Sequence, residues 1–533
     1  MNCGQILIIE DDEIWQNTFR RYLLNEGYSV VIVTSYKEAI AKLENECFHL
    51  AIIDIRLVDW DETNFEGMEI LNKISELGLD EVIKKIVVTS HGTTEIQREA
   101  FKKHKVLDFI PKGGNQKNEG LDPIAFINMV KIAFEKSINM DLKINLCENY
   151  SLDDLATSIQ SDIHPEKKIE ELTDLLKRLF SEWTQIYITP LSSGNSQSCI
   201  LKVEPFCDIR GQAHPVIVKI DNRNNVRQEN SNYNQFIRGF VGGGRHTTIE
   251  KVNYTLHLGG TIYSLLGLSG DYNSFLDYYN NVGSNRLCKT IKNLFKDTCK
   301  HWYESRGPLQ KRNLYDIYKE QLGFNHENLK RAVHFCFGKL AEEENIFFAD
   351  LNKSYPNPIY WIMSHERTFM IEIFTSVTHG DMNCNNIFVD TNSDTWLIDF
   401  AKTGKGHILR DFIELETTIK FELLTVPELK LLHNFESSII SPKKFTNKIG
   451  INEHTNNEEV KKAIQLIKCL RVAALDVIRP HDDMYEYYIG LFFHTINLLR
   501  YHWILQKKPK ARKYHILLSA AMLCEKLQNW ERM

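Results

Sequence analysis

The chain has 533 residues, of which 43% are hydrophobic and 25% are charged, a composition typical of folded globular proteins that excludes wholesale disorder. One hydrophobic core rarely serves more than about 200 residues, so this length predicts roughly two to four domains. The net charge of -6 provides no overall basic surplus, which argues against nucleic acid as a general partner.

The sequence also predicts a cytoplasmic protein without a membrane span. Its longest apolar stretch, around Tyr488–Leu499, is shorter than the ~20 residues that a span requires. The N-terminus passes directly into Ile6–Ile9 and a group of acids, with no basic segment or cleavage site of a leader peptide. The 11 cysteines are scattered and never spaced Cys-x-x-Cys, so we expect reduced thiols rather than disulfides or a zinc site.

Residues 1–136 are predicted to form a first domain. Short apolar strands alternate with segments of helical periodicity, which predicts a doubly wound α/β fold with a parallel sheet covered on both faces. The predicted strands are Ile6–Ile9, Val30–Val33, Leu50–Ile53, Ile86–Val88 and Asp108–Ile110, and the predicted helices are Glu13–Asn25, Tyr36–Glu46, Gly67–Leu77 and Thr94–His104.

Polar residues follow several of these strands at the point where each strand ends. They are Glu10, Asp11 and Asp12 after the first strand, Asp54 after the third, Thr89 and Ser90 after the fourth, and Lys112 after the fifth. Functional groups of such sheets gather at this edge, where several carboxylates repel one another unless a divalent cation lies among them. Mg²⁺ prefers oxygen ligands, and a lysine opposite would neutralise a phosphoryl group carried by one carboxylate.

Four segments of this domain resemble the response-regulator receiver family, whose fold is flavodoxin-like. They are Ile8-Ile9-Glu10-Asp11-Asp12, Ile53-Asp54, Val88-Thr89-Ser90 and Pro111-Lys112. The resemblance implies that Asp54 accepts a phosphoryl group from a phosphohistidine, so the expected partner is a sensor histidine kinase or a phosphotransfer protein. It also implies that Asp11 and Asp54 hold Mg²⁺ with the help of Glu10 or Asp12.

The same resemblance assigns the surrounding switch residues. Lys112 would bridge to the phosphoryl group, Thr89 would close on it, and Phe109 matches the aromatic switch position. The stretch from Asp54 to Gly67 is longer than the family usually shows, Val58 stands where a proline is common, and Gly113-Gly114 follows the lysine in place of proline. Three further acids lie in the long stretch: Asp59, Asp61 and Glu62. They either raise the affinity for Mg²⁺ or solvate a loop, and we favour the loop.

Residues 137–182 show no strand pattern and are predicted to be a helical connector. A helix is expected from Pro165, with one apolar stripe made of Ile169, Leu172, Leu175, Leu176 and Leu179. A stripe this short does not establish a coiled coil. A packed connector helix is therefore favoured over a coupling or dimer helix, although the latter keeps a second copy of the chain among the candidate partners.

A small strand-rich lobe is predicted at residues 183–266, followed by a larger and mostly helical lobe at residues 267–533. The strands expected in the small lobe are Ile186–Thr189, Ser198–Val203, Val216–Ile220, Ile249–Leu256 and Thr261–Leu265. This order of lobes is suggestive of a bilobal α+β fold and does not identify one without further motifs.

The most informative segment begins at His379-Gly380-Asp381 and continues through Asn386 to Asp399. It places a carboxylate, a carboxamide and a second carboxylate among short apolar strands. Phosphoryl transfer requires these groups, because one carboxylate orients the attacking hydroxyl while an amide oxygen and another carboxylate hold Mg²⁺ against the nucleotide phosphates. Three roles at this spacing make a stronger signal than a His-Gly-Asp triplet by itself.

The spacing resembles the kinase-like phosphotransferase superfamily, and its His-Gly-Asp form is similar to the aminoglycoside and choline phosphotransferase branch. The resemblance implies a bilobal protein-kinase-like fold with ATP as the phosphoryl donor. It makes Asp381 the catalytic base, Asn386 and Asp399 the Mg²⁺ ligands, and His379 a structural residue. A long activation loop ending in Ala-Pro-Glu is missing, which counts against an ordinary protein kinase.

Further residues of that family have matches upstream and downstream. Lys219, on the third strand of the small lobe, would bind the α- and β-phosphates, and Glu229 would pair with it. The loop over the phosphates would contain Ser193, Gly194, Asn195 and Ser196, unless that segment is a plain hairpin turn. Gly242–Gly244 is better read as a connection than as a phosphate loop, and Lys507–Lys513 as a solvated turn. Asp411 either caps a helix or holds the catalytic loop.

Taken together, these motifs predict a response regulator whose output domain moves the γ-phosphoryl group of ATP, with Mg²⁺, to a hydroxyl acceptor. The acceptor, a small molecule or a protein, cannot be named from the sequence, and neither can the sign of regulation by Asp54. Two alternatives stay open: a kinase-like module that binds nucleotide and a partner without transfer, and a protein Ser/Thr kinase. DNA-binding output is disfavoured because no helix-turn-helix pattern follows the receiver.

Overall fold

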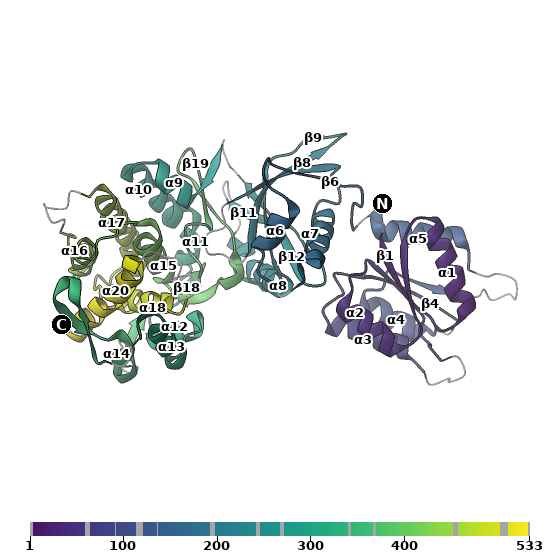
Figure 1. Cartoon of the computed structure of the whole chain (residues 1–533), viewed down its shortest axis with the longest axis horizontal. Helices are drawn as coiled ribbons and strands as arrows, with labels where there is room; N and C mark the ends of the chain where they lie inside the picture. Colours follow the sequence, from purple (N-terminus) through teal and green to yellow (C-terminus); the bar gives the residue numbers. More distant parts are fainter. Residues whose placement is uncertain are drawn as a thin grey trace. The chain divides into compact units, whose positions relative to one another are not determined.

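We describe a computed structural model of the chain (Figure 1), which forms two compact units. The first contains Met1–Gln228 and Ile249–Ser264, and the second contains Glu229–Thr248 and Leu265–Met533. The residues that the structure describes are 4–58, 64–90, 92–112, 121–135, 137–161, 163–191, 198–240, 246–266, 271–338, 343–365, 369–450, 457–501 and 510–530.

Unit 1 begins with a five-stranded parallel sheet of order β2-β1-β3-β4-β5. Its strands are β1 (Gln5–Ile9), β2 (Ser29–Val33), β3 (Leu50–Ile53), β4 (Lys84–Thr89) and β5 (Asp108–Pro111). Its helices are α1 (Glu13–Asn25), α2 (Tyr36–Asn45), α3 (Glu66–Glu76), α4 (Thr94–His104) and α5 (Pro123–Glu135). Every strand and helix predicted for this domain is confirmed, because each strand is a continuous apolar run between polar turns.

Alternate side chains of each strand form two separate cores, one on each face of this sheet. Ile6 and Ile8 of β1 pack with Phe19 of α1 and Phe126 of α5, whereas Leu7 and Ile9 pack with residues of α2 and α3. Figure 1 shows the resulting layers, with α1 and α5 covering the face opposite to α2, α3 and α4. This is the doubly wound arrangement that the sequence predicted.

A second sheet completes unit 1, with the order β11-β12-β10-β8-β7-β6 and β9 paired with β8. The strands are β6 (Lys143–Leu146), β7 (Gln185–Pro190), β8 (Cys199–Cys207), β9 (Gly211–Gln212), β10 (Val216–Asn222), β11 (His246–Tyr254) and β12 (Leu258–Leu266). The helices are α6 (Leu152–Ser158), α7 (Pro165–Leu179) and α8 (Arg223–Asn232), the last of which joins β10 to η1 (Tyr233–Ile237) and η2 (Arg238–Phe240).

The connector at residues 137–182 differs from its prediction. It contains β6, which pairs in parallel with β7 and so extends the sheet, and α6 and α7 pack on the same sheet through Leu155, Leu172 and Leu176. The prediction of a strandless connector is therefore wrong. The strand was missed because its four residues, with only two apolar side chains, present too little pattern to separate from a loop.

Within unit 1 the first domain is fixed to the second sheet by arginine side chains and a shared core. Arg178 of α7 donates to the carbonyl oxygen of Val82 at 2.6 Å, and Arg223 of α8 donates to that of Leu77 at 3.1 Å. Arg227 donates to the carbonyl oxygen of Gly78. Val226, Tyr254 and Leu256 from the second sheet belong to the same apolar cluster as α2 and α3 of the first domain.

Unit 2 consists of helices and short antiparallel sheets. Its sheets pair β13-β19-β20, β14-β17, β15-β16 and β18-β21. The strands are β13 (Tyr272–Ser274), β14 (Gln310–Asn313), β15 (Asn345–Phe348), β16 (Lys353–Pro356), β17 (Met370–Ile373), β18 (Thr375–Thr378), β19 (Ile387–Asp390), β20 (Thr395–Leu397) and β21 (Gly404–His407). These short strands interrupt the region that the sequence predicted to be mostly helical.

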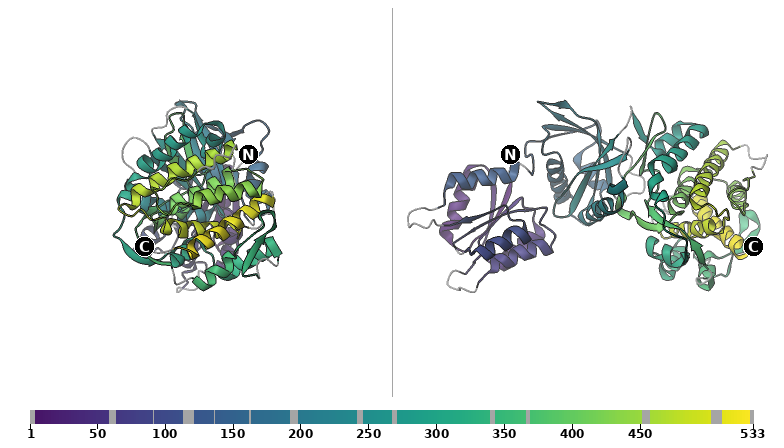
Figure 2. Two further views of the ribbon diagram at one scale, coloured as in Figure 1. Left: turned by 90° about the vertical axis from the view of Figure 1, so that its left-hand side faces the viewer. Right: turned by 180° about the vertical axis from the view of Figure 1, so that it is seen from behind.

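The helices of unit 2 lie before, between and after these strands. The first group is α9 (Phe275–Asn281), α10 (Ser284–Asn293), η3 (Leu294–Thr298), α11 (Lys300–Glu304), α12 (Leu314–Leu322), α13 (His326–Phe337), η5 (Ala349–Leu351) and α14 (Pro358–His365). The second group is η7 (Phe400–Lys402), α15 (Arg410–Thr418), η8 (Ile419–Leu423), α16 (Leu429–Ile440), α17 (Glu458–Ile478), α18 (Tyr485–Leu498) and α20 (Lys510–Gln528). The last helices run side by side (Figure 2).

The core of unit 2 combines a buried helix with buried ion pairs. The stretch Tyr487–Asn497 of α18 is buried on every face, so the longest apolar run of the sequence is a core helix. Arg471 of α17 makes a bidentate pair with Glu416 of α15, at 2.6 and 2.9 Å, which ties these two helices together. Among the described residues, no helix has both the length and the apolar character that a membrane crossing requires.

A disulfide joins Cys288 of α10 to Cys469 of α17, with the two Cα atoms 5.7 Å apart. The prediction that all cysteines are reduced is therefore wrong in this structure. The partners are 181 residues apart in sequence, and only the packing of α10 against α17 brings them together.

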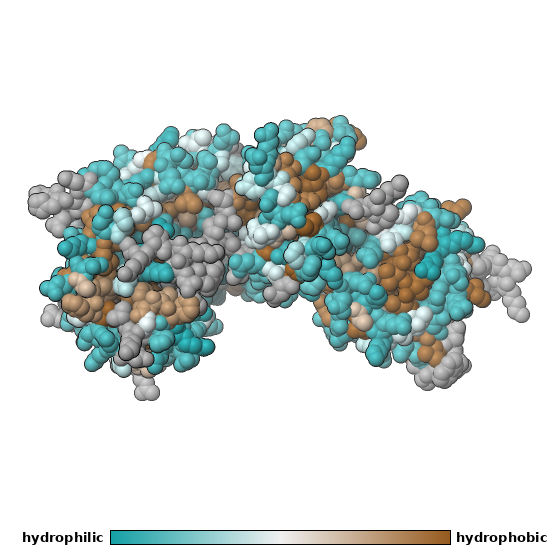
Figure 3. Space-filling view, viewed as in Figure 1, coloured by the Kyte–Doolittle hydropathy of each residue, from teal (hydrophilic) through white to brown (hydrophobic). Residues whose placement is uncertain are grey.

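The visible surface of the molecule is mainly hydrophilic, with apolar side chains scattered across it (Figure 3). On the first domain the most exposed of these are Ile14 of α1 and Ile124 of α5. Single exposed apolar side chains are normal on folded proteins.

Candidate functional site

The first candidate site lies at the carboxyl edge of the first sheet. Glu10, Asp11 and Asp54 each offer one carboxylate oxygen, and these three atoms lie within 4.8 Å of one another. Glu10 follows β1 and Asp54 follows β3, so the parallel pairing of these two strands brings the residues together. A donor set made only of oxygen atoms fits Mg²⁺, which completes its coordination with water.

Lys112 closes this acidic cluster from the end of β5. Its Nζ lies 2.7 Å from Glu10 and 2.5 Å from Asp54, and all three side chains are buried. Burial acts to lower the pKa of Lys112, but the charges of Asp54 and Glu10 outweigh it and the pKa is raised. Burial raises the pKa of Glu10 to about 7, against the opposing effect of Lys112. The cluster is therefore a buried cation–carboxylate network.

Asp12 has a different position from its acidic neighbours. Its Oδ1 accepts hydrogen bonds from the backbone N–H groups of Ile14, at 2.6 Å, and Trp15, at 3.3 Å, so it is the N-cap of α1. The sequence left open whether Glu10 or Asp12 assists Asp11 and Asp54. The structure places Glu10 in the cluster, because the backbone turns away from the sheet edge at the start of α1.

The remaining switch residues of the first domain lie on β4 and β5. Thr89 ends β4 and is buried, and its carbonyl oxygen accepts a hydrogen bond of 3.0 Å from the backbone N–H of Lys112. Phe109 is half-buried on β5 and packs at the edge of the α2–α3 core. The acids Asp59, Asp61 and Glu62 lie outside the described residues.

The second candidate site is the loop between β18 and β19 in unit 2. The two carboxylate oxygens of Asp381 have separate partners: Oδ1 lies 2.8 Å from Nζ of Lys402, and Oδ2 lies 3.2 Å from Nδ2 of Asn386. Nδ2 of Asn386 also donates to the Asp381 carbonyl oxygen at 2.9 Å. Because its amide N–H₂ group is used in this way, Asn386 keeps its side-chain oxygen as an acceptor.

Asp411 of α15 holds this loop through its backbone. Its two carboxylate oxygens accept hydrogen bonds from the N–H groups of His379, at 2.8 Å, and Gly380, at 2.9 Å. The buried hydroxyl of Tyr303 donates to the same carboxylate at 2.9 Å. Of the two roles that the sequence allowed for Asp411, the structure supports the anchoring of the loop. His379 is buried, and its ring nitrogen Nε2 lies 3.0 Å from the carbonyl oxygen of Ile398.

Asp399 lies at the turn after β20, in the left-handed backbone region with φ of 69°. The N–H of Ile398 donates to the carbonyl oxygen of Asn386 at 3.1 Å, which brings the backbone next to Asp399 close to Asn386. Both side chains carry oxygen atoms of the kind that Mg²⁺ prefers, and their binding of the ion stays a prediction. Glu229, buried on α8, accepts a hydrogen bond of 2.9 Å from the N–H of Phe400 and so holds the segment that follows Asp399.

The other nucleotide-binding predictions are only partly placed. Lys219 lies in the middle of β10 and is buried. It belongs to unit 1 and Glu229 to unit 2, so their pairing stays a prediction. Ser193, Gly194, Asn195 and Ser196, and also Gly242–Gly244, lie outside the described residues. Lys510 begins helix α20, so the predicted solvated turn at Lys507–Lys513 ends in a helix.

Two charged residues beside Asp381 were not identified from the sequence. One is Lys402, and the other is Glu414 of α15, which accepts a hydrogen bond of 3.0 Å from the N–H of Met382. Burial and the neighbouring charge of Asp381 raise the pKa of Glu414 to about 7. No motif marks either residue, because each reaches Asp381 only through the folding of the segments after Asp399.

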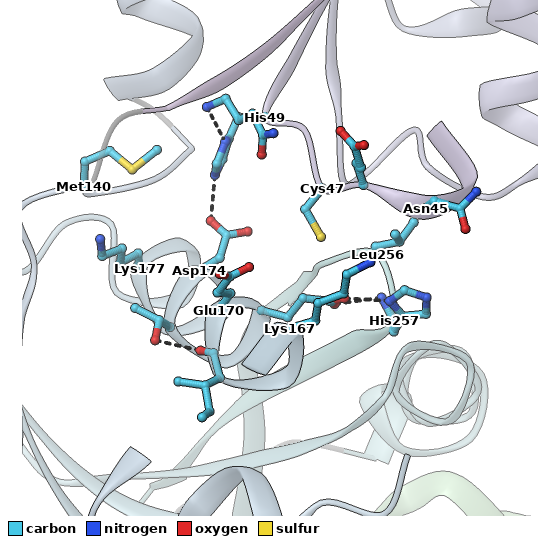
Figure 4. Close-up of a pocket in the computed structure, with 15 residues that line it drawn as sticks. Asn45, Cys47, His49, Met140, Lys167, Glu170, Asp174, Lys177, Leu256 and His257 are labelled. Carbon is cyan, nitrogen blue, oxygen red and sulfur yellow. Dashed lines mark hydrogen bonds and ion pairs between the residues drawn. The ribbon is translucent and has the colours of Figure 1, made fainter. Parts of the chain in front are cut away.

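A cavity of about 490 Å³ lies in unit 1 between the first domain and α7 (Figure 4). At its wall Nε2 of His49 donates to Asp174 at 2.7 Å, while Nδ1 of the same ring accepts from the Gln5 N–H at 3.0 Å. Gln5 begins β1 and His49 precedes β3, so this contact lies at the edge opposite to Asp54. The acidic cluster and the attachment to α7 therefore occupy opposite ends of the same strands.

Comparison with known proteins gives two family matches, and the second begins at residue 184, inside unit 1. Residues 6–119 match the model of the response regulator receiver domain. Residues 184–336 and 326–499 match the model of ternary complex associated domain 9, and together they exceed half of the chain.

Three individual relatives each match about a fifth to a quarter of the chain. A 14.6 kDa protein encoded in the sodA1 3' region of Leptolyngbya boryana is 27% identical over 126 residues, which is 24% of this chain and 86% of that protein. The alginate biosynthesis transcriptional regulatory protein AlgB of Pseudomonas aeruginosa is 30% identical over 109 residues, 20% of this chain and 22% of its own length. A CheY-like receiver domain structure from Methanospirillum hungatei is 31% identical, with a TM-score of 0.21, and covers 24% of this chain and 92% of that one.

Proposed function

Since the chain belongs to the ternary complex associated domain 9 family and carries a response-regulator receiver domain, we propose that it is a two-component regulator whose output domain transfers a phosphoryl group. The donor would be ATP and the acceptor a hydroxyl group. A histidine kinase or a phosphotransfer protein would supply the signal by phosphorylating Asp54.

The receiver half of this proposal uses the acidic cluster. Asp54 would attack the phosphorus atom of a phosphohistidine as the bond from phosphorus to the histidine nitrogen breaks and the histidine leaves. Lys112, 2.5 Å away, would move from the carboxylate to the new phosphoryl oxygens. Glu10, Asp11 and Asp54 would hold Mg²⁺, which supplies positive charge to the phosphoryl oxygens when it is bound. Thr89, buried at the end of β4, has the hydroxyl that would close on the phosphoryl group.

One observation carries the output half: the carboxylate of Asp381 is oriented from both sides, by Asn386 and by Lys402, on a loop fixed by Asp411. A base that must accept the proton of a hydroxyl needs this kind of fixed orientation. In the proposed reaction, the hydroxyl proton passes to Asp381 as the acceptor oxygen bonds to the γ-phosphorus, and the bond to the β-phosphate oxygen breaks. Asn386 and Asp399 would hold Mg²⁺ against the phosphates.

The second sheet of unit 1 also supports a kinase-like output domain. Strand β10 carries the buried Lys219 and lies between β8 and β12, and helix α8 with Glu229 follows it in the chain. Protein kinases bind nucleotide phosphates with a lysine on the third strand of the small lobe and pair it with a glutamate on the next helix. We include Lys219 in the proposal because it lies on strand β10, at the position where the resemblance expects the phosphate-binding lysine.

The direct test is ATP turnover by the full chain and by the Asp381→Asn variant, with release of ADP as the measured quantity. We expect the variant to lose about 100-fold or more in kcat, because the base is removed while the shape of the side chain is kept. The matched control is Asp394→Asn, which changes an acid on the β19–β20 turn. Equal rates for wild type and Asp381→Asn would refute phosphoryl transfer and leave a nucleotide-binding module.

The receiver is tested separately with acetyl phosphate or beryllium fluoride as the phosphodonor or its mimic. Wild type should be modified and Asp54→Ala should not, because no other carboxylate in the described cluster faces Lys112 from the end of β3. Asp12→Ala is the control and should be modified normally. Equal labelling of wild type and Asp54→Ala would remove Asp54 from the proposed role.

A further inference from the structure

Lys402 is the basic residue that directly contacts the proposed catalytic base. It ends the short helix η7, and its Nζ lies 2.8 Å from Oδ1 of Asp381. Its side chain is 56% exposed, whereas that of Asp381 is 21% exposed. The lysine side chain is thus the more exposed member of this pair.

The backbone around Lys402 is fixed on the catalytic loop by several contacts. A Cβ atom on Gly380 would lie 2.4 Å from the Lys402 carbonyl oxygen, and Gly380 has φ of +78°, so only glycine permits this approach. The hydroxyl of Thr403 donates to the carbonyl oxygen of His379 at 3.0 Å. The amide of Asn232 donates to the carbonyl oxygen of Ala401 at 2.7 Å. The position of Lys402 is therefore determined by the fold.

The charges around this lysine explain why it stays next to Asp381. The carboxylates of Asp381 and Glu414 both act on it, and the Asp381 charge is the main reason that the pKa of Lys402 is raised. Among the described residues, Arg410 is another cation near the loop, and its buried side chain donates through Nη2 to the carbonyl oxygen of Gly380 at 2.8 Å. Lys402 is thus an exposed cation beside Asp381, whereas Arg410 contacts the backbone.

Phosphoryl transfer needs a cation at this place. In the transition state, negative charge is spread over the three equatorial oxygens of the transferring group. The loop that follows Asp381 reads Met382-Asn383-Cys384-Asn385-Asn386 and has no basic side chain. A side-chain cation next to the base, in addition to the proposed Mg²⁺ and Lys219, would therefore come from another segment of unit 2.

We propose that Lys402 is a catalytic residue that binds the transferring phosphoryl group and releases Asp381 to accept the proton, an assignment that rests on the proposed function. When a nucleoside triphosphate and a hydroxyl acceptor are bound, Nζ of Lys402 contacts a γ-phosphoryl oxygen. The acceptor oxygen bonds to the γ-phosphorus, its proton passes to Asp381, and the nucleoside diphosphate leaves with the electron pair of the broken bond. The lysine keeps its three protons throughout.

The experiment compares wild type with Lys402→Met, Lys402→Arg and Lys405→Met in the full chain. ATP with Mg²⁺ is the probe and water serves as the acceptor, and kcat, KM for ATP and the pH profile of kcat are measured. Lys405 is an exposed lysine on β21, three residues away, and is the matched control. Binding of a non-hydrolysable ATP analogue is measured by calorimetry for every variant.

We expect Lys402→Met to lower kcat by about 100-fold with KM and analogue binding unchanged, because the lost contact is strongest in the transition state. Lys402→Arg should recover part of the rate, and Lys405→Met should match wild type. The acid limb of the kcat profile should move to higher pH in Lys402→Met, because Asp381 loses the neighbouring positive charge.

Three outcomes would overturn the assignment. Unchanged kcat in Lys402→Met, with Asp381→Asn inactive, would remove Lys402 and leave the proposed function in place. A raised KM with unchanged kcat would make Lys402 a ground-state binding residue. Wild-type turnover no higher than that of Asp381→Asn would refute the proposed function, and the assignment of Lys402 with it.

Discussion

The two candidate sites each pair an aspartate with a lysine, but the two pairs differ in burial. The Asp54–Lys112 pair has side chains only 2% and 5% exposed, whereas the Asp381–Lys402 pair has side chains 21% and 56% exposed. Both lysines reach their aspartates at short distance, 2.5 and 2.8 Å. We call the buried Asp54–Lys112 pair the closed pair and the partly exposed Asp381–Lys402 pair the open pair. The closed pair is part of a core, whereas the open pair must be held in place by other contacts.

The closed pair carries a large electrostatic cost if one member is removed. Taking a charge out of water costs several kcal/mol, and only the partner charge offsets it. The open pair is screened by solvent and contributes about 0–1 kcal/mol to stability. The receiver pair should therefore matter for folding as well as for chemistry, and the Asp381–Lys402 pair chiefly for chemistry.

The largest expected effect is that of Lys112→Met on stability. Its removal leaves Glu10 and Asp54 buried without their cation, and we expect a loss of about 3–5 kcal/mol in the free energy of unfolding of the receiver. Lys402→Met should cost less than about 1 kcal/mol. Urea unfolding followed by the fluorescence of Trp15, whose ring lies 5.7 Å from Nζ of Lys112, measures the first value. Similar losses for both variants would invalidate the distinction between closed and open pairs.

The geometry of the Asp381–Lys402 pair depends on Asp411, whose carboxylate binds the backbone of the Asp381 loop. Asp411→Ala leaves the N–H groups of His379 and Gly380 buried without an acceptor, so we expect loss of the loop geometry. The rate of ATP turnover should fall by about 100-fold, since a small displacement of a catalytic group has this effect. Normal turnover in Asp411→Ala would show that the loop keeps its geometry without the Asp411 carboxylate.

The acidic cluster around the closed pair should show a pH dependence through Glu10. The pKa of Glu10 is raised from 4.5 to about 7, so the folded receiver retains a proton there that the unfolded chain loses. The stability due to this proton is complete below pH 4.5 and is lost as the pH rises through 7. Because Mg²⁺ must displace the proton, its apparent Kd should rise by about tenfold for each pH unit below 7.

This dependence is measured by Mg²⁺ titration of Trp15 fluorescence between pH 5 and 8. Glu10→Gln should bind Mg²⁺ more weakly at pH 8 and show a much flatter profile, because the titrating group is gone. If the Mg²⁺ affinity of Glu10→Gln changes with pH as steeply as that of wild type, the titrating proton belongs to another group of the cluster.

The smallest expected effect concerns Asp12, which lies next to the cluster in sequence but caps α1. Asp12→Ala should cost about 1 kcal/mol of stability through the lost cap and leave Mg²⁺ affinity unchanged. Asp11→Ala is the comparison, and it should abolish binding of the ion. A marked loss of Mg²⁺ affinity in Asp12→Ala would place Asp12 among the ligands.

The sequence was sufficient to predict the fold of the receiver, because the patterns that mark its strands and edge acids are local. Most strands contain an apolar run of three or four residues, and Glu10 and Asp54 come directly after such runs. It could not decide between Glu10 and Asp12, because that choice depends on the residue at which α1 begins. Asp381 and Asn386 were predicted from their spacing; the structure shows their side chains in contact, and their roles stay predictions.

The residues that the sequence did not reveal are brought in by long-range folding. Lys402 and Glu414 lie 21 and 33 positions after Asp381, and no periodicity relates them to it. Strand β6 is too short to be recognised without β7 beside it. The pairing of Cys288 with Cys469 depends on the contact between α10 and α17.

That disulfide has a topological consequence for unit 2. The bond closes a covalent ring that runs from Cys288 to Cys469 and contains Asp381, Asn386 and Asp399. A protease that cuts the chain once inside this ring produces two pieces that remain joined through sulfur and separate only when a thiol reductant is added. The Asp381 loop of a nicked molecule would thus stay covalently attached to the segments on both sides of the cut.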